Sequence, residues 1–207
     1  MALAFDELFA IPDAFKGTPF PGRTDAWILS DAAAVHGIAP DAPALARFPD
    51  VYLGHLAREL EKDGPRKGIM PGVRQLLDAL SRRDDAYLAL LTGNYERGAK
   101  LKLQYFDLWR YFRCGAFGDD APDRTTLLPT AVARVAACGG PVVLAADAIV
   151  IGDTPLDIAV AAAGGARSIG VATGSHSVDD LRVAGADIVF EDLSDTNAVM
   201  GALGIEA

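Results

Sequence analysis

The chain has 207 residues, a hydrophobic content of 51% and a formal net charge of −9 at pH 7. This length allows one large domain or two small ones, and the apolar content is sufficient for a buried core. The negative charge argues against nucleic-acid and membrane-surface partners, since neither polyanionic surface would attract the chain.

Residues 1–64 have a helical pattern. Apolar residues recur at helical spacing in segments 1–9, 26–36 and 42–60, which are separated by turns rich in Pro and Gly. Asp6 lies in the first segment, and we interpret it as part of an amphipathic helix and not as a nucleophile. Residues 61–68 are polar and contain Gly and Pro, which indicates a linker. We therefore predict a helical domain over residues 1–66 and a second domain over residues 67–207.

The second domain alternates strands and helices, which predicts an α/β fold with a doubly wound parallel sheet. Residues 142–146 are also strand-like, although they could be the end of a loop that leads into the next strand. The main strand candidates are residues 86–91, 113–117, 148–151, 167–171 and 187–190.

Two carboxylates follow the apolar strand 148–151. Asp153 stands at the carboxyl end of the strand, where open α/β sheets place their ligands, and Asp157 falls one helical turn later on the same side. Two hard oxygen ligands suit Mg²⁺, which binds a few carboxylates together with water and a substrate phosphate. The alternative is that Asp153 only caps the helix that begins near Pro155.

A second polar junction follows strand 86–91. Thr92, Gly93 and Asn94 place a hydroxyl and backbone N–H groups at a strand-to-helix turn, where an anion can be held. An ordinary helix cap is the alternative interpretation.

Together these motifs resemble those of the haloacid dehalogenase-like hydrolase superfamily, in particular its phosphoglycolate-phosphatase-like members. Residues 90–94 resemble the second motif of the family, whose Thr or Ser binds the transferring phosphoryl group. Residues 152–157 resemble its fourth motif, whose acids hold Mg²⁺. Residues 70–77 are similar to the start of the family's core domain, and residues 164–174 resemble the helix-to-strand return that follows the fourth motif. The resemblance covers essentially the whole chain and implies an α/β core with a small helical cap.

The family's third motif is a Lys that neutralises the phosphoryl group and the nucleophile. Arg124 occupies the corresponding position here, although its planar guanidinium is not equivalent to an ammonium. Lys100 and Lys102 are alternative cations, and each of the three could instead be an exposed helix charge. Residues 20–25 resemble the cap loop that reaches into the active site of the family, where Arg23 could bind a substrate phosphate or carboxylate.

The family's first motif, Asp-x-Asp-Gly-Thr after a strand, does not occur in the sequence. In the family it supplies the nucleophile and the acid that protonates the leaving group, and its strand lies between the strands that end here at Thr92 and Asp153. Loss of a central strand would leave two rows of backbone groups unpaired, each at a cost of about 1–3 kcal/mol. A typical domain has a stability of only roughly 5–15 kcal/mol. We therefore expect either a true start upstream of Met1, which we favour, or a rearranged sheet.

The resemblance implies a Mg²⁺-dependent phosphatase that cleaves a small phosphate monoester through an aspartyl-phosphate. The alternative is a catalytically inactive module that binds phosphate and metal without the nucleophile. The implied catalytic residues are Thr92, Arg124 and Asp153. The implied phosphate-binding residues are Arg23, Thr92, Gly93, Asn94 and Lys102. The implied magnesium ligands are Asp153 and Asp157.

The remaining expectations concern partners and location. The substrate would be a small phosphorylated metabolite, and we expect a monomer or homodimer with no nucleic-acid or membrane partner. Cys114 and Cys138 lack metal-type spacing, so we expect reduced thiols in a cytoplasmic protein. His176 follows a predicted strand and could border the site, although a loop position without a role is the simpler interpretation.

Overall fold

A layer of three helices forms the amino-terminal part of the computed structural model, which describes residues 1–64 and 67–205. The helices are α1 (Ala2–Phe9), α2 (Asp25–Val35) and α3 (Pro43–Leu60), and each agrees with its predicted bounds to within one residue. Phe5 and Phe48 are fully buried in the core that these helices share. Large aromatic side chains bury the most apolar surface per residue, so they dominate the stability of such a small layer.

Asp6 lies inside α1, as the helical spacing predicts. The residue before it, Phe5, packs against Phe9 and Phe15 with ring centroids 4.6 and 5.3 Å apart. The segment is therefore an amphipathic helix and not a strand that carries a nucleophile.

The rest of the chain alternates strands and helices, and every strand pair is parallel, which confirms the α/β class. The strands are β1 (Leu90–Leu91), β2 (Gly115–Ala116), β3 (Ile149–Gly152), β4 (Arg167–Val171) and β5 (Ile188–Phe190). The α-helices are α4 (Val73–Leu80), α5 (Glu96–Tyr105), α6 (Leu127–Ala137), α7 (Pro155–Gly164), α8 (Val178–Val183) and α9 (Thr196–Ala202). Short 3-10 helices cover Trp109–Tyr111, Arg124–Thr126 and Ala145–Asp147.

Two of the strand predictions were too long. Residues 86–89 and 113–114 lie outside the ladder, so β1 and β2 each keep only two paired residues. Residues 142–146 are not a strand, because residues 142–144 form no regular structure and a 3-10 helix follows them. Val142 is 91% exposed, so no sheet packs against it.

The strands form two parallel sheets in the described chain. In the described chain β1 pairs only with β2, and β3 pairs only with β4, which pairs in turn with β5. Ile151 in β3 is 38% exposed, although a strand inside a doubly wound sheet is normally buried on both faces. Leu90 and Leu91 of β1 are likewise only half-buried. The interruption lies between β1 and β3, where the family's first strand would be.

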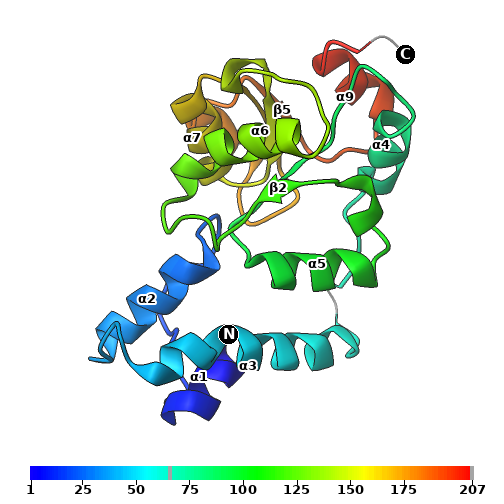
Figure 1. Cartoon of the computed structure of the whole chain (residues 1–207). Coiled ribbons are helices and arrows are strands. Elements are labelled where there is room, and N and C mark those ends of the chain that lie inside the picture. Colours follow the sequence, from blue (N-terminus) through cyan, green and yellow to red (C-terminus); the bar gives the residue numbers. More distant parts are fainter. Residues whose placement is uncertain (65–66, 206–207) are drawn as a thin grey trace.

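Helices cover both faces of the sheets, which makes the fold doubly wound. On one face α4 and α9 pack against β4 through a cluster that contains Leu76, Val199 and Ile169. On the other face α6 and α7 pack against β3 through Leu128, Val160 and Val150, and Leu91 of β1 joins this cluster. The two sheets therefore share a helical layer although their strands are not paired (Figure 1).

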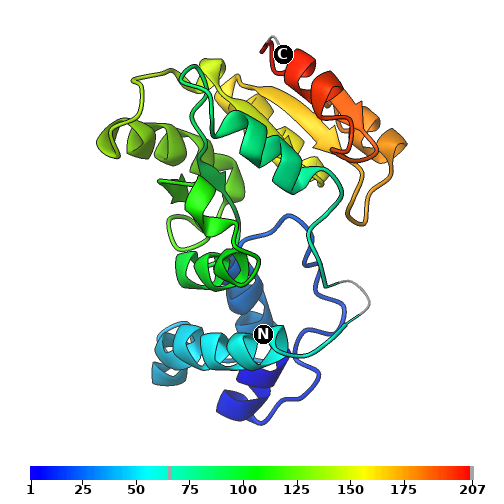
Figure 2. The same cartoon turned by 90° about the vertical axis from the view of Figure 1, so that its right-hand side faces the viewer.

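The helical layer and the α/β region meet along α5. Figure 2 shows α1 to α3 gathered at one end of the molecule, with the sheets and their helices at the other. Helix α3 packs against α5 in the described chain. The boundary predicted at residues 65–66 lies outside the described residues, so the division into domains 1–66 and 67–207 stays a prediction. No helix among residues 1–64 and 67–205 is both long and apolar enough to span a membrane.

Candidate active site

The loop after β3 is organised by a capping box at the start of α7. The Thr154 hydroxyl accepts a hydrogen bond from the Asp157 backbone N–H, and Asp157 Oδ2 accepts hydrogen bonds from Thr154 N at 3.0 Å and Thr154 Oγ1 at 2.8 Å. Pro155 takes the first helical position, where its missing N–H costs nothing. The interpretation of Asp153 as the helix cap is therefore wrong, because Thr154 is the cap.

Arg124 reaches Asp157 from a different element. Its Nη2 donates to Asp157 Oδ1, and its Nη1 donates to the backbone oxygen of Gly22 at 2.7 Å. The two side chains are 14% and 5% exposed, so this is a buried ion pair. The Arg124 Nε–H is buried and has no hydrogen-bond acceptor among the described residues. A buried donor normally has a partner, so this atom marks a place where an anionic oxygen would be stabilised.

Asp153 lies beside this pair and remains half-buried. Burial raises the pKa of Asp153, and the neighbouring Asp157 carboxylate raises it further. Arg124 and His176 act on the pKa of Asp153 in the opposite direction. A Cβ atom at Gly174 would lie 2.1 Å from Asp153 Oδ2, so only glycine leaves room for the carboxylate there.

The loop after β1 is arranged differently. Thr92 Oγ1 accepts a hydrogen bond from Asn94 N at 3.2 Å, and the Asn94 backbone oxygen accepts one from Gly118 N at 2.8 Å. The cap of α5 is Tyr95, so Thr92 is not an ordinary helix cap. The Thr92 hydroxyl keeps its own hydrogen to donate to an anion.

Lys102 supports this loop from beneath. Its Nζ donates to Asn94 Oδ1, and burial lowers the pKa of the Lys102 ammonium. Lys100 lies elsewhere, 5.7 Å from the centre of the Trp109 ring, on an exposed surface. Of the alternative cations, Lys102 therefore reaches the β1 loop, Arg124 reaches the β3 loop and Lys100 reaches neither.

Residues 22–25 lie across both loops, and we call this segment the cap strap. At its end Asp25 N donates to Gly93 O at 2.7 Å, and a Cβ at Gly93 would lie 2.3 Å from Arg23 O. At its start a Cβ at Gly22 would lie 2.7 Å from Thr154 Oγ1. The strap therefore connects the carboxyl ends of β1 and β3, which do not pair with each other.

Within the cap strap, Arg23 and Thr24 have separate roles. The Arg23 guanidinium lies 3.8 Å from the centre of the Trp27 ring, a cation–π contact with the first turn of α2. Thr24 caps α2 by accepting from Trp27 N at 3.1 Å, and its hydroxyl donates to Pro122 O at 2.8 Å. The structure thus brings the Arg23 backbone to the loop after β1, and a substrate contact of its side chain stays a prediction.

Asp25 lies within the predicted cap loop, residues 20–25, but sequence reasoning did not single it out as a candidate site residue. Its Oδ2 accepts from Tyr95 N at 2.9 Å, and burial raises the pKa of its carboxyl. The Lys102 ammonium opposes that rise. A usable signal existed in the sequence: Thr24 and Asp25 are adjacent and only one of them can cap α2.

Asp153 fits a magnesium ion that is bound mainly by water and phosphate. Mg²⁺ keeps several waters and needs only one or two protein carboxylates. Asp157 uses both of its oxygens, for Thr154 and for Arg124. Over residues 1–64 and 67–205 no three His, Cys, Asp or Glu side chains are placed to share a metal ion. In the structure Asp157 pairs with Arg124, and its role as a metal ligand stays a prediction.

Residues 124–196 match the HAD-hydrolase-like family model. No curated protein sequence matches the chain.

Solved structures match the fold over nearly the whole chain. A predicted phosphoglycolate phosphatase from Haemophilus somnus 129PT is 16% identical, with a TM-score of 0.68 over 96% of this chain and 88% of that one. A hydrolase from Pseudomonas syringae is 20% identical, with a TM-score of 0.64 over 97% and 92%. CbbY from Rhodobacter sphaeroides, in complex with xylulose-1,5-bisphosphate, is 17% identical, with a TM-score of 0.66 over 94% and 87%. These structures share the fold, and the family model covers the segment from Arg124 through the β3 loop. The chain therefore has the fold of these hydrolases, and its residues 124–196 match the HAD-hydrolase-like family model.

Proposed function

We propose that the protein is a phosphatase that cleaves small phosphate monoesters at the edge between β1 and β3. The observation that carries this proposal is the meeting of three features under the cap strap. These are the Thr92–Asn94 turn, the Asp153 carboxylate and the buried Arg124 Nε–H that lacks an acceptor among the described residues. A phosphate ester offers several anionic oxygens, which would satisfy donors on both sides of the site.

The residues of this chain would bind and orient the phosphoryl group. The Thr92 hydroxyl would donate to one oxygen, and Lys102 holds the Asn94 amide so that its NH₂ group can donate to another. The buried Lys102 ammonium would offset the charge that the phosphate brings. The cap strap would exclude water, because its backbone contacts both loops.

We further propose that Mg²⁺ is the cofactor, held by Asp153 together with phosphate oxygens and water. When bound, the ion would offset negative charge on the phosphate and on the attacking group. Arg124 would neutralise the charge of the Asp157 carboxylate while the ion is bound. Asp157 would then stabilise the start of α7 and position Asp153 from one helical turn away.

The attacking aspartate of the family's two-step mechanism does not occur among the motifs of residues 1–207. Among the described residues β1 and β3 each pair with one other strand, and we propose that an extended segment that carries this aspartate pairs with both. Its carboxylate would attack phosphorus as the bond to the leaving alcohol breaks. A second acid would give that alcohol its proton and then take one from the water that hydrolyses the aspartyl-phosphate.

A second candidate function is phosphate binding without turnover. The observation that favours it is the buried Arg124–Asp157 ion pair, which commits one of the two predicted metal ligands. Such a module would bind inorganic phosphate or a phosphate ester and release it unchanged.

The test measures binding and hydrolysis on the same protein. Calorimetric titration with inorganic phosphate should show binding that Lys102→Met weakens by roughly tenfold or more, the value of a charged hydrogen bond. Lys100→Met is the matched control on the same helix and should leave binding unchanged. In a protein that includes the segment with the attacking aspartate, hydrolysis of p-nitrophenyl phosphate should require Mg²⁺ and be lost in Asp153→Asn. Binding without hydrolysis would support the second candidate, and absence of phosphate binding would contradict both.

A further inference from the structure

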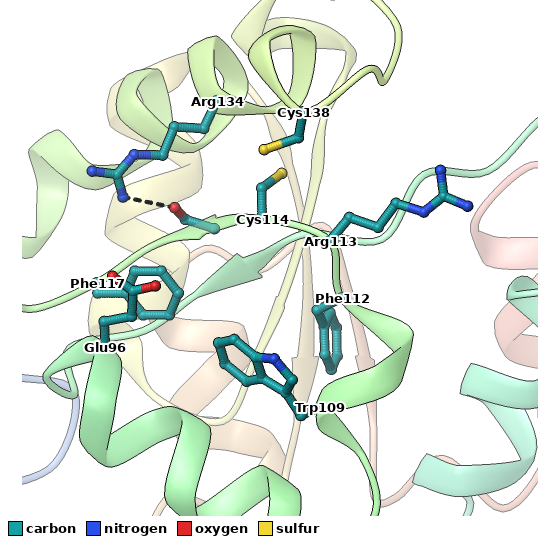
Figure 3. Close-up of a pocket in the computed structure, with 9 residues that line it drawn as sticks. Glu96, Trp109, Phe112, Arg113, Cys114, Phe117, Arg134 and Cys138 are labelled. Carbon is teal, nitrogen blue, oxygen red and sulfur yellow. Dashed lines mark hydrogen bonds between the residues drawn. The ribbon is translucent and has the colours of Figure 1, made fainter.

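A cavity away from the candidate active site is lined by both cysteines of the chain. It has a volume of about 240 Å³ and lies between the start of β2 and the end of α6 (Figure 3). Trp109, Phe112 and Phe117 form its apolar wall, and Arg113 and Arg134 lie at its rim. Glu96 also lines the cavity, which is large enough for part of a small molecule.

The two thiols point toward each other across this cavity, as Figure 3 shows. Cys114 directly precedes β2, and Cys138 directly follows the last residue of α6 as its C-cap. Each is a free thiol. The two cysteines are 24 residues apart in sequence, so their approach is a product of tertiary packing and not of a local turn.

The backbones beside the two cysteines are held in place by a third contact. Arg134, one turn before Cys138 on α6, donates from Nη1 to the backbone oxygen of Gly115 at 2.8 Å. It also pairs with Asp120, which follows β2. Helix α6 is therefore fixed to β2 next to both thiols.

The two thiols differ in access. Cys138 is exposed, whereas Cys114 is half-buried and its Sγ lies 3.9 Å from the Tyr87 hydroxyl. Burial raises the pKa of the Cys114 thiol, and the neighbouring Cys138 adds to the rise. The thiolate is the reactive form. Cys138 is thus the first thiol that an oxidant in solution would meet, and Cys114 is the one placed to resolve the product.

We propose that Cys114 and Cys138 form a redox-active dithiol, which a small anionic disulfide such as glutathione disulfide converts to an intramolecular disulfide. The Cys138 thiolate would attack one sulfur of that molecule and release one glutathione as the thiol. The Cys114 thiolate would then attack the Cys138 sulfur of the mixed disulfide and release the second. The protein loses two electrons and two protons, and glutathione disulfide becomes two glutathione molecules.

The disulfide would act on the segment that supplies part of the candidate active site. Residues 114–138 include Gly118, which donates to Asn94 O, and Arg124, which pairs with Asp157. A bond between the ends of this segment would reduce the conformational freedom of its unfolded state. The inference does not depend on the proposed phosphatase activity, because it rests on the cysteines alone.

The test is titration of the intact, folded chain with mixtures of glutathione disulfide and glutathione. After acid quenching and alkylation, mass spectrometry should show loss of two hydrogen atoms and no alkylated cysteine. Peptide mapping should place the bond between Cys114 and Cys138. The thermal denaturation midpoint of the oxidised form should be several degrees higher than that of the reduced form.

Two serine variants separate the steps. Cys114→Ser should stop at a mixed disulfide on Cys138, and Cys138→Ser should keep its remaining thiol far longer than the wild type does. A folded wild-type protein that retains both thiols in excess glutathione disulfide would overturn the proposal. A mixed disulfide on Cys138 that is never converted to the Cys114–Cys138 disulfide would also overturn it. So would a disulfide that forms faster when urea is added, because the bond would then form in the unfolded chain.

Discussion

The two loops that flank the interruption of the sheet are built on different principles. The loop after β3 is stabilised by its own residues, through the capping box of Thr154 and Asp157. The loop after β1 depends on distant parts of the chain, because its backbone contacts Asp25 and Gly118 and its side chain Asn94 is held by Lys102. One edge of the site is thus locally encoded, and the other exists only in the folded chain.

This difference determines which substitutions should destabilise each of the two loops. Local capping interactions form with their helix and contribute modest amounts each. Contacts between the cap strap and the β1 loop join elements about 70 residues apart, as in the 2.9 Å bond from Tyr95 N to Asp25 Oδ2. Arg124 belongs to both systems, since it binds the β3 loop through Asp157 and the cap strap through Gly22.

The largest expected effect comes from breaking the contact that the two systems share. Arg124→Met leaves the buried Asp157 charge without its partner and should lower the free energy of unfolding by about 3–5 kcal/mol. Arg124→Met combined with Asp157→Asn should recover more than half of this loss, because Asn can still accept from Thr154. Urea denaturation of the three proteins measures both values. A loss below about 1 kcal/mol in the single variant would show that the pair is not buried in solution.

A smaller effect is expected from separating the cap strap from the β1 loop. A Cβ at Gly93 would lie 2.3 Å from the Arg23 backbone oxygen, so Gly93→Ala should cost about 1–3 kcal/mol. Gly54→Ala is the control, because Gly54 lies within α3 and nothing stands within 4 Å of its Cβ position. It should stabilise the protein by roughly 0.5–1 kcal/mol. Equal effects of the two substitutions would contradict the contact.

The local loop should respond less. Thr154→Ala removes the α7 cap and should cost about 1 kcal/mol, whereas Thr154→Ser keeps the hydroxyl and should cost less. Thermal unfolding, followed by circular dichroism, compares the two variants. An equal loss in both would assign the effect to the methyl group and not to the cap.

The smallest effect is a change in pH dependence at the distant contact. Burial raises the pKa of Asp25 in the folded state above its ordinary value of 3.8. The folded state therefore binds the proton more tightly, and the stability of the wild type relative to Asp25→Asn should fall as pH rises from 3.8 through the raised pKa. Unfolding free energies at several pH values give this difference. A difference that grows with pH instead would mean that the Lys102 ammonium outweighs burial.

Local patterns in the sequence were enough for the α/β class, for the helices of the amino-terminal layer and for the position of Asp153 after a strand. Helical spacing placed α1 to α3 within one residue of their observed bounds. These predictions succeeded because amphipathic spacing and capping depend on residues fewer than about ten positions apart, so both patterns are visible in the sequence. The short ladder of β1 was not predictable, because strand length depends on the neighbour with which the strand pairs.

The tertiary structure alone decided the partners. It buried Asp25 and Lys102 together beside the β1 loop and paired Arg124 with Asp157. It also placed Cys114 opposite Cys138. In the described chain it paired β1 only with β2 and β3 only with β4, so that the strands form two separate sheets. The physical reason is that the pKa of a buried group and the pairing of a strand depend on which surfaces exclude water from them. Those surfaces come from segments that no local pattern connects.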